Sequence, residues 1–178
     1  MSYGGLVMFP YGRNHHYKFA KFYRDPVLYF GAYCTFDSKG DVFTDGTIDG
    51  EYGFALSELP RGSKTFGAVT INQRIVGPGE LQWVNGTLTV ADRGKPNGPA
   101  KAALIYGFTI ANGTGTEVSK TTLKSSYDLA QFWIQDNRVV GPESGSAGGI
   151  GVWDYSRGRA PVESIVGPAP TGIVISLK

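Results

Sequence analysis

The chain has 178 residues, a length typical of one domain, and its formal net charge of +2 is too small for a dedicated nucleic-acid surface. Its one cysteine, Cys34, excludes an internal disulfide and suits a protein made in a reducing compartment. The 26 glycines and 10 prolines interrupt the chain every few residues, which disfavours helices and favours short strands joined by turns. The composition therefore predicts an all-β fold with little or no helix.

Aromatic residues are concentrated near the N-terminus, where residues 1–36 hold 11 of the 23 in the chain. Basic residues such as Lys18 and Arg24 lie among them, and this mixture could stack bases in a basic groove. No extended basic run follows, so we favour strands whose aromatic faces pack in a core or in a subunit interface, where Tyr and Phe are enriched. The residues expected to contact another subunit or a neighbouring protein are Tyr3, Phe9, Tyr11, Phe19, Phe22 and Tyr23.

The same end of the chain has no basic leader and only a short apolar stretch, so we expect neither a secretory signal nor a membrane anchor. His15 and His16 are the only histidines. Neighbours on a strand point to opposite faces, so the two could not both bind one metal from a regular strand. Cys34 has apolar neighbours and is expected to be a buried structural cysteine. No cofactor is expected.

Acidic residues recur at every fourth position in the next segment, as Asp37, Asp41, Asp45, Asp49 and then Glu51. Oxygen-rich loops bind calcium, which makes this segment a candidate calcium site. An EF-hand loop, however, places its acids on alternate positions with a glycine at the sixth, and this segment does not. We therefore expect solvated turns, including one at Asp45-Gly46, in which aspartate side chains support the backbone locally.

The clearest local pattern covers residues 81–90, Leu-Gln-Trp-Val-Asn-Gly-Thr-Leu-Thr-Val. Asn85-Gly86 suits the two positive-φ positions of a type I′ turn, whose twist matches that of paired strands. Folding there sets Trp83 opposite Leu88 and places both on one face with the apolar residues at the ends. The segment predicts a β-hairpin, and a second Asn-Gly at residues 112–113 follows another alternating stretch.

Further strands are expected at residues 64–71, 104–111, 150–155, 161–166 and 172–177. Residues 125–135 have apolar spacing that fits either a helix or a strand, and we favour a strand. Val-Gly-Pro occurs at residues 76–78, 140–142 and 166–168. Proline cannot donate to a ladder, so we interpret each as a strand terminator. The unequal spacing argues against a true repeat.

The sequence contains no recognisable catalytic motif. No Gly-x-Ser-x-Gly precedes a helical pattern, and no phosphate-binding loop is present. Distant residues could still form a triad or a carboxylate pair, because such groups need not be close in sequence. We expect a non-enzymatic protein, with a cryptic hydrolase as the remaining enzymatic alternative.

One phrase resembles a known family. Residues 149–159 read Gly-Ile-Gly-Val-Trp-Asp-Tyr-Ser-Arg-Gly-Arg and lead to Val162-Glu163-Ser164. This is similar to a phrase in small tailed-bacteriophage virion proteins, roughly Gly-Leu-x-Val-Tyr-Asn-x-x-Gly-x-x-x-Phe-Asp-Ser. The start, Met-Ser-Tyr-Gly-Gly-Leu-Val, resembles their openings with Gly5 as an extra residue, and residues 106–113 echo the phrase. The aromatic-acid ending of the family phrase is absent.

The resemblance implies a β-sandwich protein of the phage tail or tail tip that binds itself or neighbouring virion proteins. No catalytic residue belongs to that family pattern. The protein would then be made in the host cytoplasm and reside in the virion.

The sequence as a whole predicts one all-β domain over residues 1–178, an antiparallel β-sandwich or, as an alternative, an open β-barrel. A subdivision into an aromatic-rich portion, 1–60, and a sandwich core, 61–178, is also considered. The leading function is a structural virion protein acting through protein–protein assembly. The alternative is a carbohydrate-binding module in which exposed Trp153 and Tyr155 stack on sugar rings.

Overall fold

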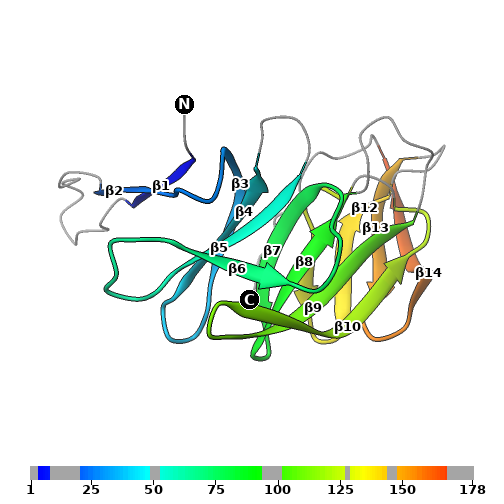
Figure 1. Cartoon of the computed structure of the whole chain (residues 1–178). Helices are drawn as coiled ribbons and strands as arrows, with labels where there is room; N and C mark the ends of the chain where they lie inside the picture. The colour runs from blue at the N-terminus through cyan, green and yellow to red at the C-terminus, as the bar shows by residue number, and fades with distance from the viewer. Residues whose placement is uncertain are drawn as a thin grey trace, which may run out of the picture.

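The computed structural model in Figure 1 describes residues 4–8, 21–48, 53–93, 102–126, 129–143 and 148–167. These residues form strands and turns without any helix, which confirms the all-β expectation. No helix in these ranges could span a membrane. The strands are β1 (Gly5–Met8), β2 (Lys21–Arg24), β3 (Phe30–Phe36), β4 (Val42–Thr47), β5 (Phe54–Leu59), β6 (Gly67–Ile71), β7 (Pro78–Val84), β8 (Thr87–Asp92), β9 (Ala103–Ala111), β10 (Thr114–Leu123), β11 (Trp133–Gln135), β12 (Arg138–Pro142), β13 (Gly149–Asp154) and β14 (Gly158–Val166).

Three successive antiparallel meanders make up most of the described chain. The first sheet is β3-β4-β5-β6, the second is β7-β8-β9-β10 and the third is β11-β12-β13-β14. Short parallel pairings join their fourth strands, at Thr70 and Thr114 between β6 and β10 and at Leu123 and Arg159 between β10 and β14. Strands β1 and β2 form a separate ribbon. The strand order does not close on itself over the described ranges.

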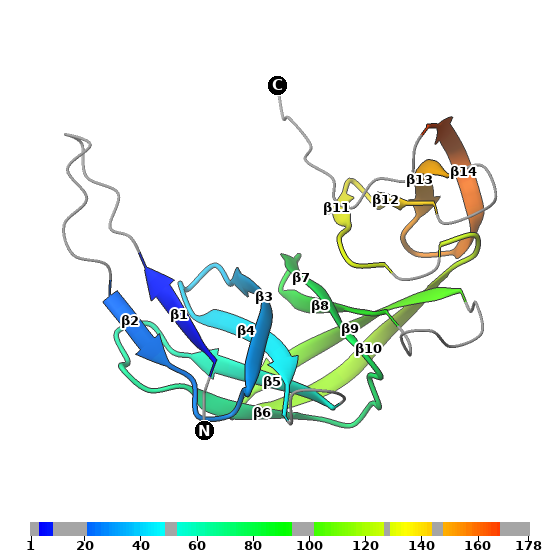
Figure 2. The same cartoon turned by 90° about the horizontal axis from the view of Figure 1, so that it is seen from above.

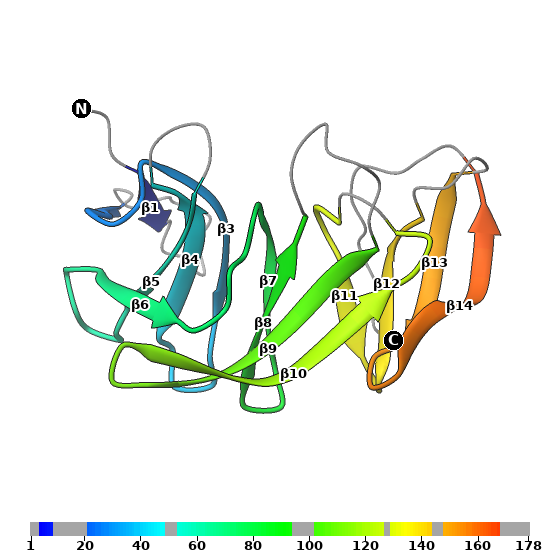
Figure 3. The same cartoon turned by 45° about the vertical axis from the view of Figure 1, so that its right-hand side comes forward.

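The three sheets are arranged as a fan. In Figure 2 the sheets form an arc, with the first strands, β3, β7 and β11, on its inner side and the fourth strands, β6, β10 and β14, on its outer side. Figure 3 shows the long β9-β10 hairpin crossing between the first and third sheets. The second sheet therefore lies between the other two.

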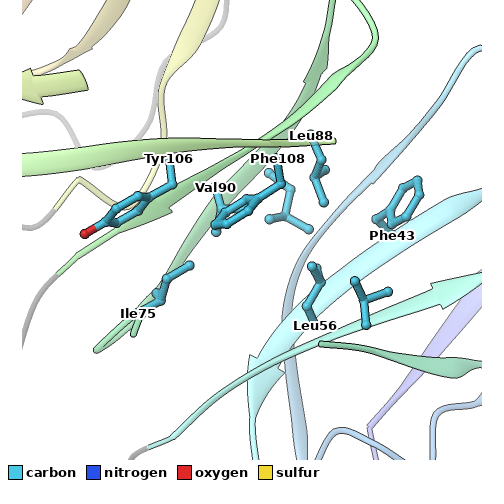
Figure 4. Close-up of a cluster of buried hydrophobic side chains, with 9 residues drawn as sticks. Phe43, Leu56, Ile75, Leu88, Val90, Tyr106 and Phe108 are labelled. Atoms are coloured by element: carbon cyan, nitrogen blue, oxygen red, sulfur yellow. The ribbon is translucent and has the colours of Figure 1, made fainter. Parts of the chain in front are cut away.

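The first hydrophobic core fills the space between the first and second sheets. Phe43, Leu56 and Val69 come from β4, β5 and β6, and they meet Leu88 and Phe108 from β8 and β9 (Figure 4). The Trp83 ring stacks on Phe43 with a centroid separation of 5.3 Å and an interplanar angle of 12°. These contacts bury apolar surface from two sheets at once.

The second core lies between the second and third sheets. The other set of alternating residues on β8 and β9, among them Ala91 and Ile105, packs against Val139 and Trp153 of the third sheet and against Phe132 just before β11. Because side chains alternate along a strand, the middle sheet buries one set in each core. Two cores between three sheets thus replace the single core of a two-sheet arrangement.

Turn chemistry accounts for the tight hairpins. Asn85 and Gly86 have φ values of 49° and 80°, and strands β7 and β8 pair Trp83 with Leu88 as expected. Asn112 and Gly113 repeat this geometry between β9 and β10, with φ values of 50° and 69°. The hairpin prediction is confirmed in its turn and its register.

A third hairpin of the same kind was not foreseen. Asp136 and Asn137 join β11 to β12 with φ values of 48° and 63°. Asn and Asp tolerate the left-handed region better than other residues with a β-carbon, so this turn forms without glycine. In residues 129–135 only Trp133–Gln135 is a strand, and the segment has no helix.

The Val-Gly-Pro segments occupy three different places in the meanders. The first leads into β7, which begins at Pro78, so its interpretation as a terminator is wrong. The second ends β12 at Pro142, and β14 ends at Val166 within the third. Gly167 follows β14 outside any strand, whereas Pro168 and the strand expected at residues 172–177 lie outside the described residues. The three segments therefore lie at one strand start and two strand ends, and they share no structural role.

A different repeat relates the first and third sheets. Gly53 and Gly149 stand at the start of the third strand of each meander, with φ values of 128° and 130°. Nine positions later in both cases, Gly62 and Gly158 have φ values of 81° and 61°. These backbone angles favour glycine, which has no β-carbon. The two hairpins, β5-β6 and β13-β14, therefore share two glycine positions, although the segments that connect their strands differ in length.

Candidate functional site

The expected N-terminal interface is described only in part. Tyr3, Phe9, Tyr11 and Phe19 lie outside the described residues. Phe22, on β2, is 64% exposed, and Tyr23 beside it is half-buried. A β-carbon at Gly5 would lie 2.6 Å from the Phe22 ring, so the ring packs across the backbone of β1. Most of the Phe22 side chain remains open to solvent.

Strand β3 adds further exposed aromatics. Phe30 and Phe36 stand at its two ends and both are largely exposed, as is Tyr29 just before it. The strand pairs with β4 on one side and approaches β7 on the other. Exposed aromatic side chains thus occur on β3 as well as on β2.

The most exposed aliphatic side chains of the described residues are on β14. Val162, Ile165 and Val166 are 61%, 63% and 74% exposed. Residues 163–166 of the strand pair with β13 along one edge, whereas the pairing of β14 with β10 is limited to Arg159. Successive residues 162–166 are all exposed, so neither face of this half-strand is covered by the described chain. The result is a sheet edge with apolar side chains on both faces.

One ion pair is present on this half-strand. The Arg138 Nη1 atom lies 3.3 Å from the Glu163 Oε1 atom, and both side chains are more than half exposed. Such surface pairs contribute little to stability, so its main effect is to orient Glu163 toward β12.

Trp153 is fully buried, and the expectation that it is exposed for sugar stacking is wrong. It lies in the second core, and its indole N–H donates to the Lys124 carbonyl at 3.0 Å. Gly151 makes room for it, because a β-carbon there would lie 2.3 Å from the indole ring. The local sequence offered Trp153 as a stacking residue, but it could not show that the side chain points into a core.

Tyr155 is half-buried and borders a hollow of about 380 Å³. The hollow opens beside the tips of the β7-β8 and β11-β12 hairpins, and Asn85, Gln135 and Asn137 also line it. Burial raises the pKa of the Tyr155 hydroxyl, and a hydrogen bond with Ser119 partly offsets this. Tyr155 therefore keeps its proton at neutral pH.

Side chains of β7 hold the third sheet at the base of this hollow. The Gln82 amide accepts from the Ile134 N–H at 2.7 Å and donates to the Ile134 carbonyl at 2.9 Å. The Glu80 carboxylate accepts from the Phe132 N–H at 2.6 Å, and burial raises the pKa of this carboxyl. Side chains thus replace a backbone ladder between the two sheets.

A second polar group is buried under the first sheet. The Asp25 carboxylate accepts from the Thr44 hydroxyl at 3.1 Å, from the Ser57 hydroxyl and from the Val27 N–H at 2.8 Å. Thr44 and Ser57 also share a hydrogen bond of 2.7 Å. All three side chains are buried, so this cluster anchors the chain after β2 onto β4 and β5.

The acidic run does not fold as one loop. Asp37 accepts from the Lys39 and Asp41 N–H groups at 2.8 and 2.9 Å, which is the turn support expected from its sequence. Asp45 instead lies fully buried in β4, so the expectation of a solvated turn there is wrong. Asp49 and Glu51 lie outside the described residues, and the described ranges hold no cluster of three metal-ligating side chains.

Burial changes the chemistry of Asp45. Its Oδ1 atom accepts from the Tyr33 N–H at 3.0 Å, whereas Oδ2 is buried without a hydrogen-bond partner. Loss of hydration raises the pKa of this carboxyl to about 8. Cys34, on the neighbouring strand, is exposed, and the expectation that it is buried is wrong. Desolvation and the nearby Asp45 raise the thiol pKa, which makes Cys34 a weak nucleophile.

Comparisons with known proteins give a fold likeness alone. No family model matches the sequence, and no curated protein does. The crystal structure of a computationally designed protein, Ika8, is similar with a TM-score of 0.52 and 13% sequence identity. The match covers 82% of this chain and 40% of the designed chain, so this chain spans less than half of that protein's length.

Proposed function

We propose that the protein is a non-enzymatic structural subunit that acts through protein–protein assembly. The observation that carries this proposal is the half-strand of β14 with apolar side chains exposed on both faces. Exposed sheet edges pair readily with other chains, and natural proteins usually blunt them with charge, proline or a covering segment. Within residues 161–166, Pro161 and Glu163 are the residues of this kind beside the three aliphatic ones.

The exposed aromatics of β2 and β3 support the same function. Phe22, Phe30 and Phe36 are apolar side chains whose exposure brings no benefit to an isolated protein. Aromatic residues near the middle of an interface commonly dominate its binding energy. The β13-β14 hairpin carries the phrase that resembles tailed-bacteriophage virion proteins, so we place the subunit in a phage tail or tail tip.

Assembly is tested by the mass of the full chain in solution and by its incorporation into particles. Replacing Phe19 and Phe22 by serine, or deleting residues 1–24, should leave a folded β protein that no longer joins its partners. Circular dichroism checks folding and light scattering checks mass. Unfolding of these variants would assign the segment to the core, and unchanged assembly would move the interface elsewhere.

A carbohydrate-binding function is the second candidate, and the hollow beside Tyr155 favours it. Amide side chains at its rim can hydrogen-bond sugar hydroxyls, and the Tyr155 ring offers an apolar face. Glycan-array binding that is lost in Tyr155→Ala and kept in Arg157→Ala would support this alternative. Absence of binding to any glycan would remove it.

A further inference from the structure

We propose that two copies of the chain pair through β14 in an antiparallel arrangement, about a two-fold axis at Ser164. The third sheets of the two copies then form one continuous sheet. This inference rests on the proposed assembly function and names the partner, a second copy. It concerns the half-strand of residues 162–166, which we call the β14 edge.

The backbone of the β14 edge can accept another strand. Val162 to Val166 belong to β14, and Glu163 to Val166 pair with β13 on one side. On the other side, the described contact with β10 stops at Arg159, ahead of this edge. Alternate N–H and C=O groups of an edge strand point away from its single neighbour, so they require water or a new strand. Pro161 has no N–H and limits the ladder at one end.

The sequence of the edge restricts the register. A two-fold axis normal to the sheet leaves every side chain on its original face. Residues directly opposite each other in an antiparallel pair point to the same face, so the axis must lie midway between the two copies of one residue. An axis at Glu163 would set the two Glu163 carboxylates opposite each other, which is destabilising. An axis at Ile165 would set Ser164 opposite Val166 and leave Val162 unpaired.

An axis at Ser164 avoids both faults. It sets Val162 opposite Val166 of the second copy, and Val166 opposite Val162, so two apolar pairs form on one face. Glu163 then faces Ile165 and remains beside Arg138, its ion-pair partner within the same copy. Ser164 faces its own equivalent, as a small polar pair at the axis. This register therefore pairs the valines with one another and sets no like charges opposite each other, with Glu163 opposite Ile165 as its least favourable contact.

A charge exchange tests the pairing of residues 162 and 166. Val162→Glu alone and Val166→Lys alone should each cause loss of the dimer in sedimentation, because each replaces both apolar valine pairs of the interface by a charge opposite a valine, in addition to the two Glu163–Ile165 contacts. The double variant Val162→Glu/Val166→Lys should recover the dimer, since the introduced charges then face each other twice. Val118→Lys, at an exposed position on β10, is the matched control and should retain the wild-type mass. Failure of the double variant to recover would overturn the register.

Cross-linking tests the axis directly, in a Cys34→Ser background that removes the natural thiol. Ser164→Cys should give a disulfide-linked dimer under mild oxidation, because the two positions are directly opposite. Val162→Cys should not, since the two copies of residue 162 are offset by four residues, about 13 Å along the strand.

The outcomes separate this inference from the proposed function. A wild-type oligomer without cross-linking at residue 164 overturns the β14 pairing and leaves assembly through another surface. A wild-type protein that is monomeric at all concentrations and absent from particles overturns both. A wild-type monomer that dimerises when residues 168–178 are deleted would mean that the chain covers its own edge, and this also overturns the pairing.

Discussion

Asp45 is a carboxyl group placed where it cannot be hydrated. Its pKa is about 8 in the folded protein, against about 4 for an unfolded chain. Between these values the folded state holds a proton that the unfolded state has released. The free energy of unfolding should therefore fall as the pH rises from about 4 to about 8, by at most about 1.4 kcal/mol per pH unit from this group.

We expect Asp45→Asn to remove this part of the pH dependence. An amide keeps an acceptor for the Tyr33 N–H and has no charge to bury. The variant should match the wild type near pH 4 and exceed it in stability near pH 8, as measured by urea unfolding at both values. Asp136→Asn, at an exposed turn position, is the control and should leave the slope unchanged. Equal slopes for wild type and Asp45→Asn would contradict the assignment.

Trp153 is the largest of the fully buried side chains among the described residues, and the missing β-carbon of Gly151 leaves room for its ring. Trp153→Ala should cost about 3–5 kcal/mol, because it leaves a cavity in the second core. Gly151→Ala should cost about 1–3 kcal/mol by pressing a methyl group into the indole. Chemical denaturation measures both. A Trp153→Ala protein of wild-type stability would mean that the indole is not in the core.

At the scale of elements, the type I′ turns fix the register of the hairpins. Gly86 has a φ of 80°, and a β-carbon there would meet nothing within 4 Å. Gly86→Ala should therefore cost about 1 kcal/mol through backbone conformation alone. Gly67, on β6, has equally open space without a positive φ, so Gly67→Ala should be neutral or slightly stabilising. Melting temperatures of the two variants give the comparison, and equal shifts would remove the turn argument.

The hairpins were also the elements that the sequence revealed best. Asn-Gly at residues 85–86 carries its own backbone preference, so local chemistry was enough to predict turn, register and faces. Asp136-Asn137 has the same geometry without glycine, and its signal was too weak to stand out. Whether Trp153 or Phe22 is covered depends on which sheet lies opposite, and no local pattern contains that information.

The β14 edge shows the same limit. The strand at residues 161–166 was expected from its composition, but its exposure on both faces follows from the absence of a neighbouring described strand. The segment Val-Glu-Ser-Ile-Val does not alternate clearly between apolar and polar residues. This lack of a preferred buried face was the only sign in the sequence that both faces would be exposed. The acidic run was misread at Asp45 because a spacing of four residues does not distinguish a turn from a buried strand.

At the scale of the whole molecule, side chains from β7 join the second and third sheets. Gln82 both donates to and accepts from the backbone of Ile134. Gln82→Glu should cost about 1–3 kcal/mol, because a carboxylate cannot donate to the Ile134 carbonyl and leaves it unpaired. Gln135→Glu, at an exposed position, is the control. Urea unfolding of the pair at pH 7 decides this, and equal stabilities would show that the bridge is dispensable.

The middle sheet, with one core on each face, has a consequence for local opening of the fold. Amide groups on β8 and β9 can reach solvent only after one of the outer sheets has separated, because both faces of their sheet are covered. Amides on β14 and β2 lie in exposed strands that can open by themselves. Native-state hydrogen exchange should therefore be slowest on β8 and β9, with protection close to the global unfolding free energy, and fastest at the two ends of the fan.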